Sequence, residues 1–111
     1  MGRELDKKDI DIMKKLVPEI AGFVESGRMK IEYMNILPPV ANHYSRGAND
    51  FDRRLQNLSS EDVKYLADKI IDGSESVSRL SPDYAEVFFA YVGRSLTEGV
   101  ADELREIYET G

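Results

Sequence analysis

The sequence has no cysteine and no tryptophan, and it contains a single histidine, His43. Without cysteine the chain can form neither disulfide bonds nor thiolate-metal sites. A zinc site would have to combine one imidazole with carboxylates, which is an uncommon ligand set. Glycine-rich phosphate loops and His-Glu-x-x-His motifs are also absent. We therefore expect no metal and no cofactor, and we favour a protein that is not an enzyme.

Long apolar runs are missing as well. No stretch approaches the roughly 20 apolar residues of a membrane-spanning helix, so we expect no membrane partner. The first residues include the charged Arg3 and Glu4 and lack the apolar part of a signal peptide, and we expect a cytoplasmic location. The chain is 41% apolar and 32% charged, which is typical of a folded protein. A length of 111 residues suits a single domain spanning residues 1–111.

What the chain does contain is a recurring signal for the start of a helix. Leucine followed by a capping residue occurs at Leu5-Asp6, Leu58-Ser59 and Leu80-Ser81. Aspartate and serine can accept hydrogen bonds from the free amides of a first helical turn. Asp62 stands three residues after Ser59, as in a capping box. Pro82 follows Ser81, and proline suits the first helical position, so this start is the clearest of the three.

Proline residues divide the N-terminal half. Apolar spacings of three and four predict a helix over residues 6–27, with a kink at Pro18 because proline removes a backbone hydrogen bond. Residues 28–48 show both strand-like and helix-like spacing, and a helix is favoured because a lone strand has no partner. We expect Pro38-Pro39 to interrupt it, with a short turn from Pro39 to Tyr44.

In the second half of the chain, Asn49 is the predicted cap of a short helix. Three apolar residues share one face of it: Phe51, Leu55 and Leu58. The helix after Ser59 should end at Gly73, although apolar spacing leaves an extension to Leu80 open. A further break is expected at Leu96–Gly99. These elements predict an all-α fold, a compact bundle of about five or six helices packed at mixed angles.

One polar constellation is a candidate ligand or anion region. Its members are His43, Tyr44, Arg46, Arg53 and Arg54. Histidine can serve as a general base, and arginine can anchor an anion. A single histidine provides no nucleophile–base pair, and the same residues equally suit a surface loop that leads into a helix. A small ligand-binding protein or enzyme using the His43–Arg54 region is therefore the alternative function.

Negative charge is concentrated in the second half of the chain. Residues 58–111 carry twelve acidic and five basic side chains, a net charge of −7, whereas residues 28–57 carry a net charge of +2. The candidate partner face on the last helix consists of Glu98, Asp102, Glu103, Glu106 and Glu109. Such a surface attracts basic partners, although it also serves solubility alone. The favoured function is a protein-interaction or regulatory module, with a protein partner or a homodimer.

Nucleic-acid binding is a third hypothesis. Residues 50–57 and 60–72 imitate a helix-turn-helix, and Arg53-Arg54 could meet a phosphate backbone. However, the second helix opens with Glu61 and Asp62, which places carboxylates where phosphates and base edges would lie. We therefore do not expect nucleic acid to be the partner.

Overall fold

The computed structural model describes residues 7–20 and 36–110. In this part of the chain the regular elements are α1 (Lys7–Leu16), the 3₁₀ helix η1 (Pro18–Ile20), α3 (Leu37–Pro39), the π-helix η2 (Val40–Tyr44), α4 (Ala48–Leu55), α5 (Ser60–Ile71), α6 (Pro82–Ser95) and α7 (Glu98–Thr110). The predicted all-α class and the number of helices are confirmed for these residues. None of the described helices combines the length and apolar character needed to cross a membrane.

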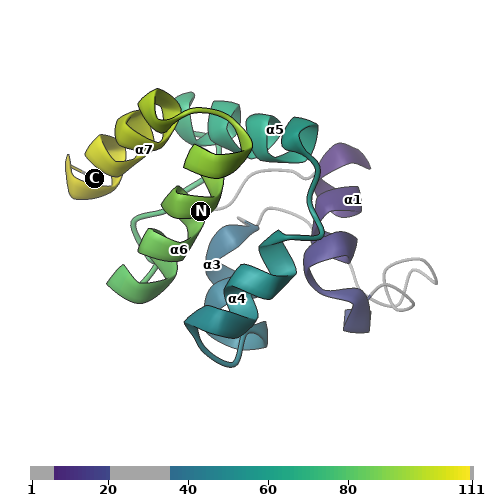
Figure 1. Ribbon diagram of the computed structural model, residues 1–111. Helices are drawn as coiled ribbons and strands as arrows, with labels where there is room; N and C mark the ends of the chain where they lie inside the picture. The colour runs from purple at the N-terminus through teal and green to yellow at the C-terminus, as the bar shows by residue number, and fades with distance from the viewer. Residues whose placement is uncertain (1–6, 21–35, 111) are drawn as a thin grey trace.

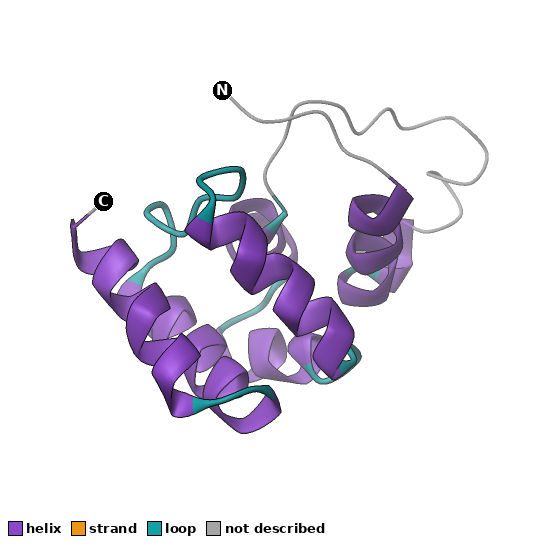
Figure 2. Cartoon of the chain, turned by 90° about the horizontal axis from the view of Figure 1, so that it is seen from above, coloured by secondary structure: helices purple, strands orange, loops and turns teal. Residues whose placement is uncertain are grey.

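The helices run in several directions rather than along one bundle axis (Figure 1). α6 packs against α4, α5 and α7, so it is the central helix of the fold. α1 and α7 lie at opposite ends of the molecule in both views (Figures 1 and 2). The Cα radius of gyration is 13.1 Å, close to the value of about 13 Å expected for a compact domain of about 100 residues. The predicted compact packing at mixed angles is thus observed.

The core is built from the predicted apolar faces. Phe51 and Leu55 of α4 are fully buried, and Leu58 is nearly so. The aromatic residues of α6 pack inward, and Phe89 meets Tyr108 of α7 edge-on with ring centroids 5.7 Å apart. These contacts explain why α6 carries apolar residues on two sides, since it is packed on both.

Two helices begin at the predicted serines, but only one serine forms a side-chain cap. Ser59 Oγ accepts a hydrogen bond from Asp62 N at 3.2 Å, and Asp62 Oδ2 accepts one from Ser59 N at 3.0 Å. This reciprocal pair is the predicted capping box. Ser81 occupies the cap position before Pro82, but its side chain makes no capping hydrogen bond.

This difference between the two serines gives a direct test of capping. We expect Ser59→Ala to lower the free energy of unfolding by about 1 kcal/mol, because it removes a side-chain cap. Ser81→Ala, the matched control, should cost less than about 0.5 kcal/mol, since no such hydrogen bond is lost. Urea denaturation of both variants at one pH measures the two values. Equal losses would contradict the assignment of the cap to Ser59 alone.

Several predicted boundaries need correction. The α-helix ends at Leu16, and Pro18 begins a 3₁₀ turn instead of kinking a longer helix. Asn49 is not the cap of α4, because the helix begins earlier, with Gly47 at the cap position. A φ of 125° at Gly47 lets the backbone turn into the helix there, a conformation that residues with a side chain rarely adopt. The predicted start at Asp6, the end of the first predicted helix over residues 21–27 with its stop at Gly27, and the predicted helix over residues 28–35 lie outside the described residues.

The predicted short turn from Pro39 to Tyr44 is found as η2, although helical structure already begins at Leu37. Pro38 and Pro39 lie in the first turn of this helical segment, where a missing N–H costs no hydrogen bond. Further along, α5 ends at Ile71, and Gly73 adopts a φ of 88°. The helix therefore stops near Gly73 and does not extend to Leu80. The predicted break before Gly99 is confirmed, since α6 ends at Ser95 and α7 begins at Glu98.

Candidate functional site

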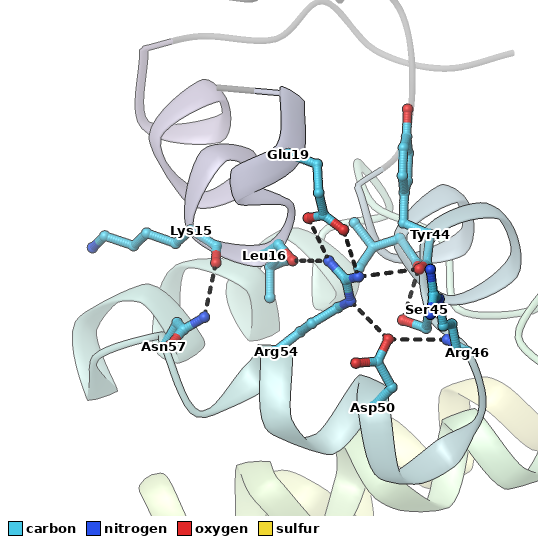
Figure 3. Close-up of polar contacts among 10 residues, drawn as sticks. Lys15, Leu16, Glu19, Tyr44, Ser45, Arg46, Asp50, Arg54 and Asn57 are labelled. Atoms are coloured by element: carbon cyan, nitrogen blue, oxygen red, sulfur yellow. Dashed lines mark hydrogen bonds and ion pairs between the residues drawn. The ribbon is translucent and has the colours of Figure 1, made fainter. Parts of the chain in front are cut away.

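Arg54 is the centre of a polar network that joins four elements (Figure 3). Its guanidinium donates to the backbone oxygens of Leu16 at 2.9 Å and Tyr44 at 3.2 Å. It also donates twice to the Glu19 carboxylate, at 3.0 and 2.8 Å, and once to Asp50 at 3.0 Å. All five guanidinium N–H groups are thereby used within the chain. Arg54 therefore clamps the end of α1, η1 and η2 onto α4.

The two carboxylates of this network are held in their charged form. Hydrogen bonds from Arg54 lower the pKa of Glu19 to about 2. The pKa of Asp50 is also lowered, first by the backbone N–H of Arg46 and then by the Arg54 side chain. The Arg54 guanidinium has its pKa raised by the hydrogen bonds to Glu19. The cluster is consequently a fixed ionic network at neutral pH, with no group poised to exchange a proton.

A shallow hollow of about 380 Å³ adjoins the network. Its lining residues are Glu19, Arg46, Asn49, Asp50, Arg53 and Arg54. Of the five predicted ligand-region residues, the three arginines line this hollow and come together as expected. Arg46 and Arg53 have exposed side chains that form no hydrogen bond or ion pair with the described part of the chain. Among the described residues, they are the two cations of the hollow without a hydrogen-bonded or ion-paired partner.

The other two predicted residues of the region lie apart from the hollow. His43 is exposed in the π-helix η2 and does not line it. Tyr44 is half-buried against the core and contributes only its backbone oxygen to the Arg54 network. The structure therefore separates the imidazole from the arginines, and a general-base role for His43 stays a prediction without geometric support.

The predicted partner face is exposed on α7. All five of its carboxylates are solvent-accessible: Glu98, Asp102, Glu103, Glu106 and Glu109. Arg105, the one basic residue of α7, lies among them. Its guanidinium packs over the Phe89 ring at 5.8 Å from the centroid and pairs with Asp102 at 3.1 Å. Because this cation is directed back onto the fold, it leaves most of the acidic face uncompensated.

Asp62 is a buried charge whose partners the sequence did not indicate. Besides its role in the capping box, its fully buried carboxylate accepts hydrogen bonds from Lys8 and Lys15 of α1. Burial alone would raise the pKa of Asp62, but the hydrogen bonds from Lys15 and Lys8 outweigh it and hold that pKa well below its usual range. The same contact raises the pKa of Lys15. These ion pairs fasten α1 to α5.

Glu75 is a second buried carboxylate that sequence reasoning missed. It accepts hydrogen bonds from the backbone N–H of Ile36, at 3.0 and 2.9 Å, and from that of Leu37 at 3.1 Å. It therefore caps the helical segment of α3 from a loop 38 and 39 residues away in sequence. A carboxylate in a serine-rich loop gives no local signal of this role.

Within residues 7–20 and 36–110, no group of three or more His, Cys, Asp and Glu side chains is arranged to hold a metal ion. In this part of the chain, the candidate sites are the acidic face of α7 and the arginine-lined hollow beside α4. Comparison of the chain with protein-family models, with curated proteins and with solved structures finds no match.

Proposed function

We propose that this protein is a non-enzymatic interaction module that binds a basic partner protein through the acidic face of α7. The observation that carries the proposal is a set of three exposed carboxylates, Glu103, Glu106 and Glu109. They form no ion pair with the part of the chain that the structure describes. The helix holds five acidic residues and one basic residue, and Arg105 is directed toward Phe89 and its acidic neighbours. A partner with surface lysines or arginines supplies the missing counter-charge.

The position of these carboxylates on the helix supports the same conclusion. Glu106 and Glu109 lie toward the C-terminal end of α7, and no basic residue occupies its last turn. Negative charge at this end of a helix opposes the helix dipole, by a few tenths of a kcal/mol for each exposed group. A basic partner would remove this unfavourable term and would add attraction that extends over a Debye length of about 8 Å at physiological ionic strength.

The chemistry of the face also selects the kind of partner. A homodimer with two-fold symmetry through α7 would place the acidic face against itself, and like charges would repel. The phosphate backbone of a nucleic acid would be repelled for the same reason. A basic protein is therefore proposed in preference to a second copy or to nucleic acid.

The test compares the native full-length chain with its Glu103→Lys/Glu106→Lys variant as baits in a pull-down analysed by mass spectrometry. We expect the wild-type chain to recover a basic protein, and the variant to lose at least about 90% of it, since two attractive contacts become repulsive. Recovery should also fall steeply with added salt. Light scattering of the bait alone reports its oligomeric state.

Glu61→Lys is the control for charge reversal elsewhere on the surface, because this exposed carboxylate lies on α5; its reversal changes the net charge by half as much as the double variant. The Glu61→Lys variant should recover as much of the partner as the wild-type chain does at the same salt concentration. Circular dichroism must show that all variants remain folded. Unchanged recovery with the double variant, or an equal loss with Glu61→Lys, would show that the α7 face serves solubility and not recognition.

A further inference from the structure

The geometry points to a phosphate-binding site in the hollow beside α4, formed by the guanidinium groups of Arg46 and Arg53. Both residues line the hollow, and neither side chain forms a hydrogen bond or ion pair with the described part of the chain, although the charge of Arg53 contributes to lowering the pKa of Asp50. Arginine is the side chain best suited to phosphate, because its planar N–H groups form two parallel hydrogen bonds to one anion. This site is independent of the acidic face of α7 and lies on different helices.

The hollow rests on a rigid base. Arg46 donates its backbone N–H to Asp50 Oδ2 at 2.9 Å, and Asp50 in turn accepts a hydrogen bond from Arg54. Arg53 follows on α4, the helix that Arg54 clamps to α1 and η2 (Figure 3). The backbone positions of the two free arginines are therefore fixed before any ligand arrives. Such preorganisation lowers the entropic cost of binding.

The charge balance of the hollow favours an anion. Its three arginines and two carboxylates give a net charge of +1 in a chain whose formal net charge is −6. Glu19 and Asp50 would repel an anion, but both are hydrogen-bonded to Arg54, which lies between them (Figure 3). Arg54 offsets only one of these two negative charges, so Arg46 and Arg53 together leave the hollow with a surplus of one positive charge. An incoming anion is thus drawn to these two groups.

The arrangement suits phosphate better than carboxylate. One carboxylate saturates a single guanidinium with its two oxygens, whereas a phosphate monoester offers three oxygens and nearly two negative charges. Asn49 also lines the hollow and provides an amide donor. A volume of about 380 Å³ exceeds that of a bare phosphate, so the site has room for the organic part of a small phosphate monoester.

The experiment follows backbone amide signals of the ¹⁵N-labelled full-length chain at pH 7 and constant ionic strength. Inorganic phosphate, glycerol 2-phosphate and acetate are titrated separately. We expect saturable shifts around residues 46–54 with both phosphates and weaker ones with acetate. Tighter binding of glycerol 2-phosphate would identify small phosphate esters as the ligand, and equal binding would identify free phosphate.

Arg46→Gln and Arg53→Gln should each raise the dissociation constant about tenfold, because each removes charged hydrogen bonds to the phosphate. Arg79→Gln is the matched control, since this exposed arginine lies in the loop after α5 and does not line the hollow. It should change the constant by less than about twofold. The proposal is overturned if no saturable shift occurs, if acetate binds as tightly as phosphate, or if Arg79→Gln weakens binding as much as Arg53→Gln.

Discussion

Replacement of Arg54 with alanine is expected to lower the free energy of unfolding by about 3 kcal/mol. The change removes five hydrogen bonds, and it leaves the backbone oxygens of Leu16 and Tyr44 without this donor. Breaking a fully buried ion pair costs about 3–5 kcal/mol. We expect a loss at the lower end of this range. The Arg54 side chain is 12% exposed, but the Glu19 side chain is 58% exposed and can be hydrated by water once Arg54 is removed. Urea denaturation at pH 7 measures the loss.

Arg53→Ala is the control for this prediction. It removes the same side chain one position earlier on α4, where the guanidinium forms no hydrogen bond or ion pair with the described part of the chain, and it should cost less than about 0.5 kcal/mol. Arg54→Lys should recover only a small part of the lost stability, because an ammonium cannot form the planar fork that reaches Glu19 and both carbonyls. Full recovery with lysine would mean that charge alone, and not geometry, holds the network together.

The role of Arg54 shows where sequence reasoning stops. The sequence marked this arginine as a candidate anion ligand, and its charge and position beside Arg53 justified that interpretation. Its partners Leu16 and Glu19 lie 38 and 35 residues away, so no local pattern could indicate them. Only the packing of α1 against α4 reveals that the Arg54 guanidinium is already occupied by Leu16 and Glu19.

Features that depend on neighbouring residues were predictable. The capping box of Ser59 and Asp62 and the helix start at Ser81-Pro82 follow from hydrogen-bonding needs within a single turn. The buried face of Phe51 and Leu55 follows from helical periodicity. The exposure of the α7 carboxylates could also be predicted, because the residues opposite the apolar face of an amphipathic helix point to solvent.

The predicted helix boundaries were wrong where a distant group or an unusual backbone conformation determines where the helix begins. The sequence predicts that the short turn to Tyr44 starts at Pro39, yet helical structure already begins at Leu37, where Glu75 supplies acceptors for the first N–H groups. At Asn49 an ordinary cap was expected, but Gly47 turns the chain into the helix earlier. Both outcomes depend on tertiary contacts or on a positive φ that spacing cannot specify.

Loss of the buried carboxylate at position 62 is expected to be as damaging as loss of Arg54. Asp62→Ala should lower the free energy of unfolding by about 3 kcal/mol at pH 7, measured by urea denaturation. It removes a helix cap and both ion pairs that join α5 to Lys8 and Lys15. Lys8 and Lys15 are each more than one-third exposed and can return to water, so the loss stays below the upper end for buried pairs.

The same site should make stability depend on pH, and Asp62→Asn isolates this effect. The folded-state pKa of Asp62 lies below its ordinary value of 3.8, so the charged carboxylate stabilises the fold fully above that value. This contribution is lost as the pH falls through the acid range. Wild type should therefore exceed Asp62→Asn in stability by a constant amount from pH 7 to about pH 5, and the gap should narrow towards pH 2. Glu19 and Asp50 titrate in both proteins and cancel in the difference. A gap that stays constant down to pH 2 would assign the stabilisation to packing and neutral hydrogen bonds instead of to the buried charge.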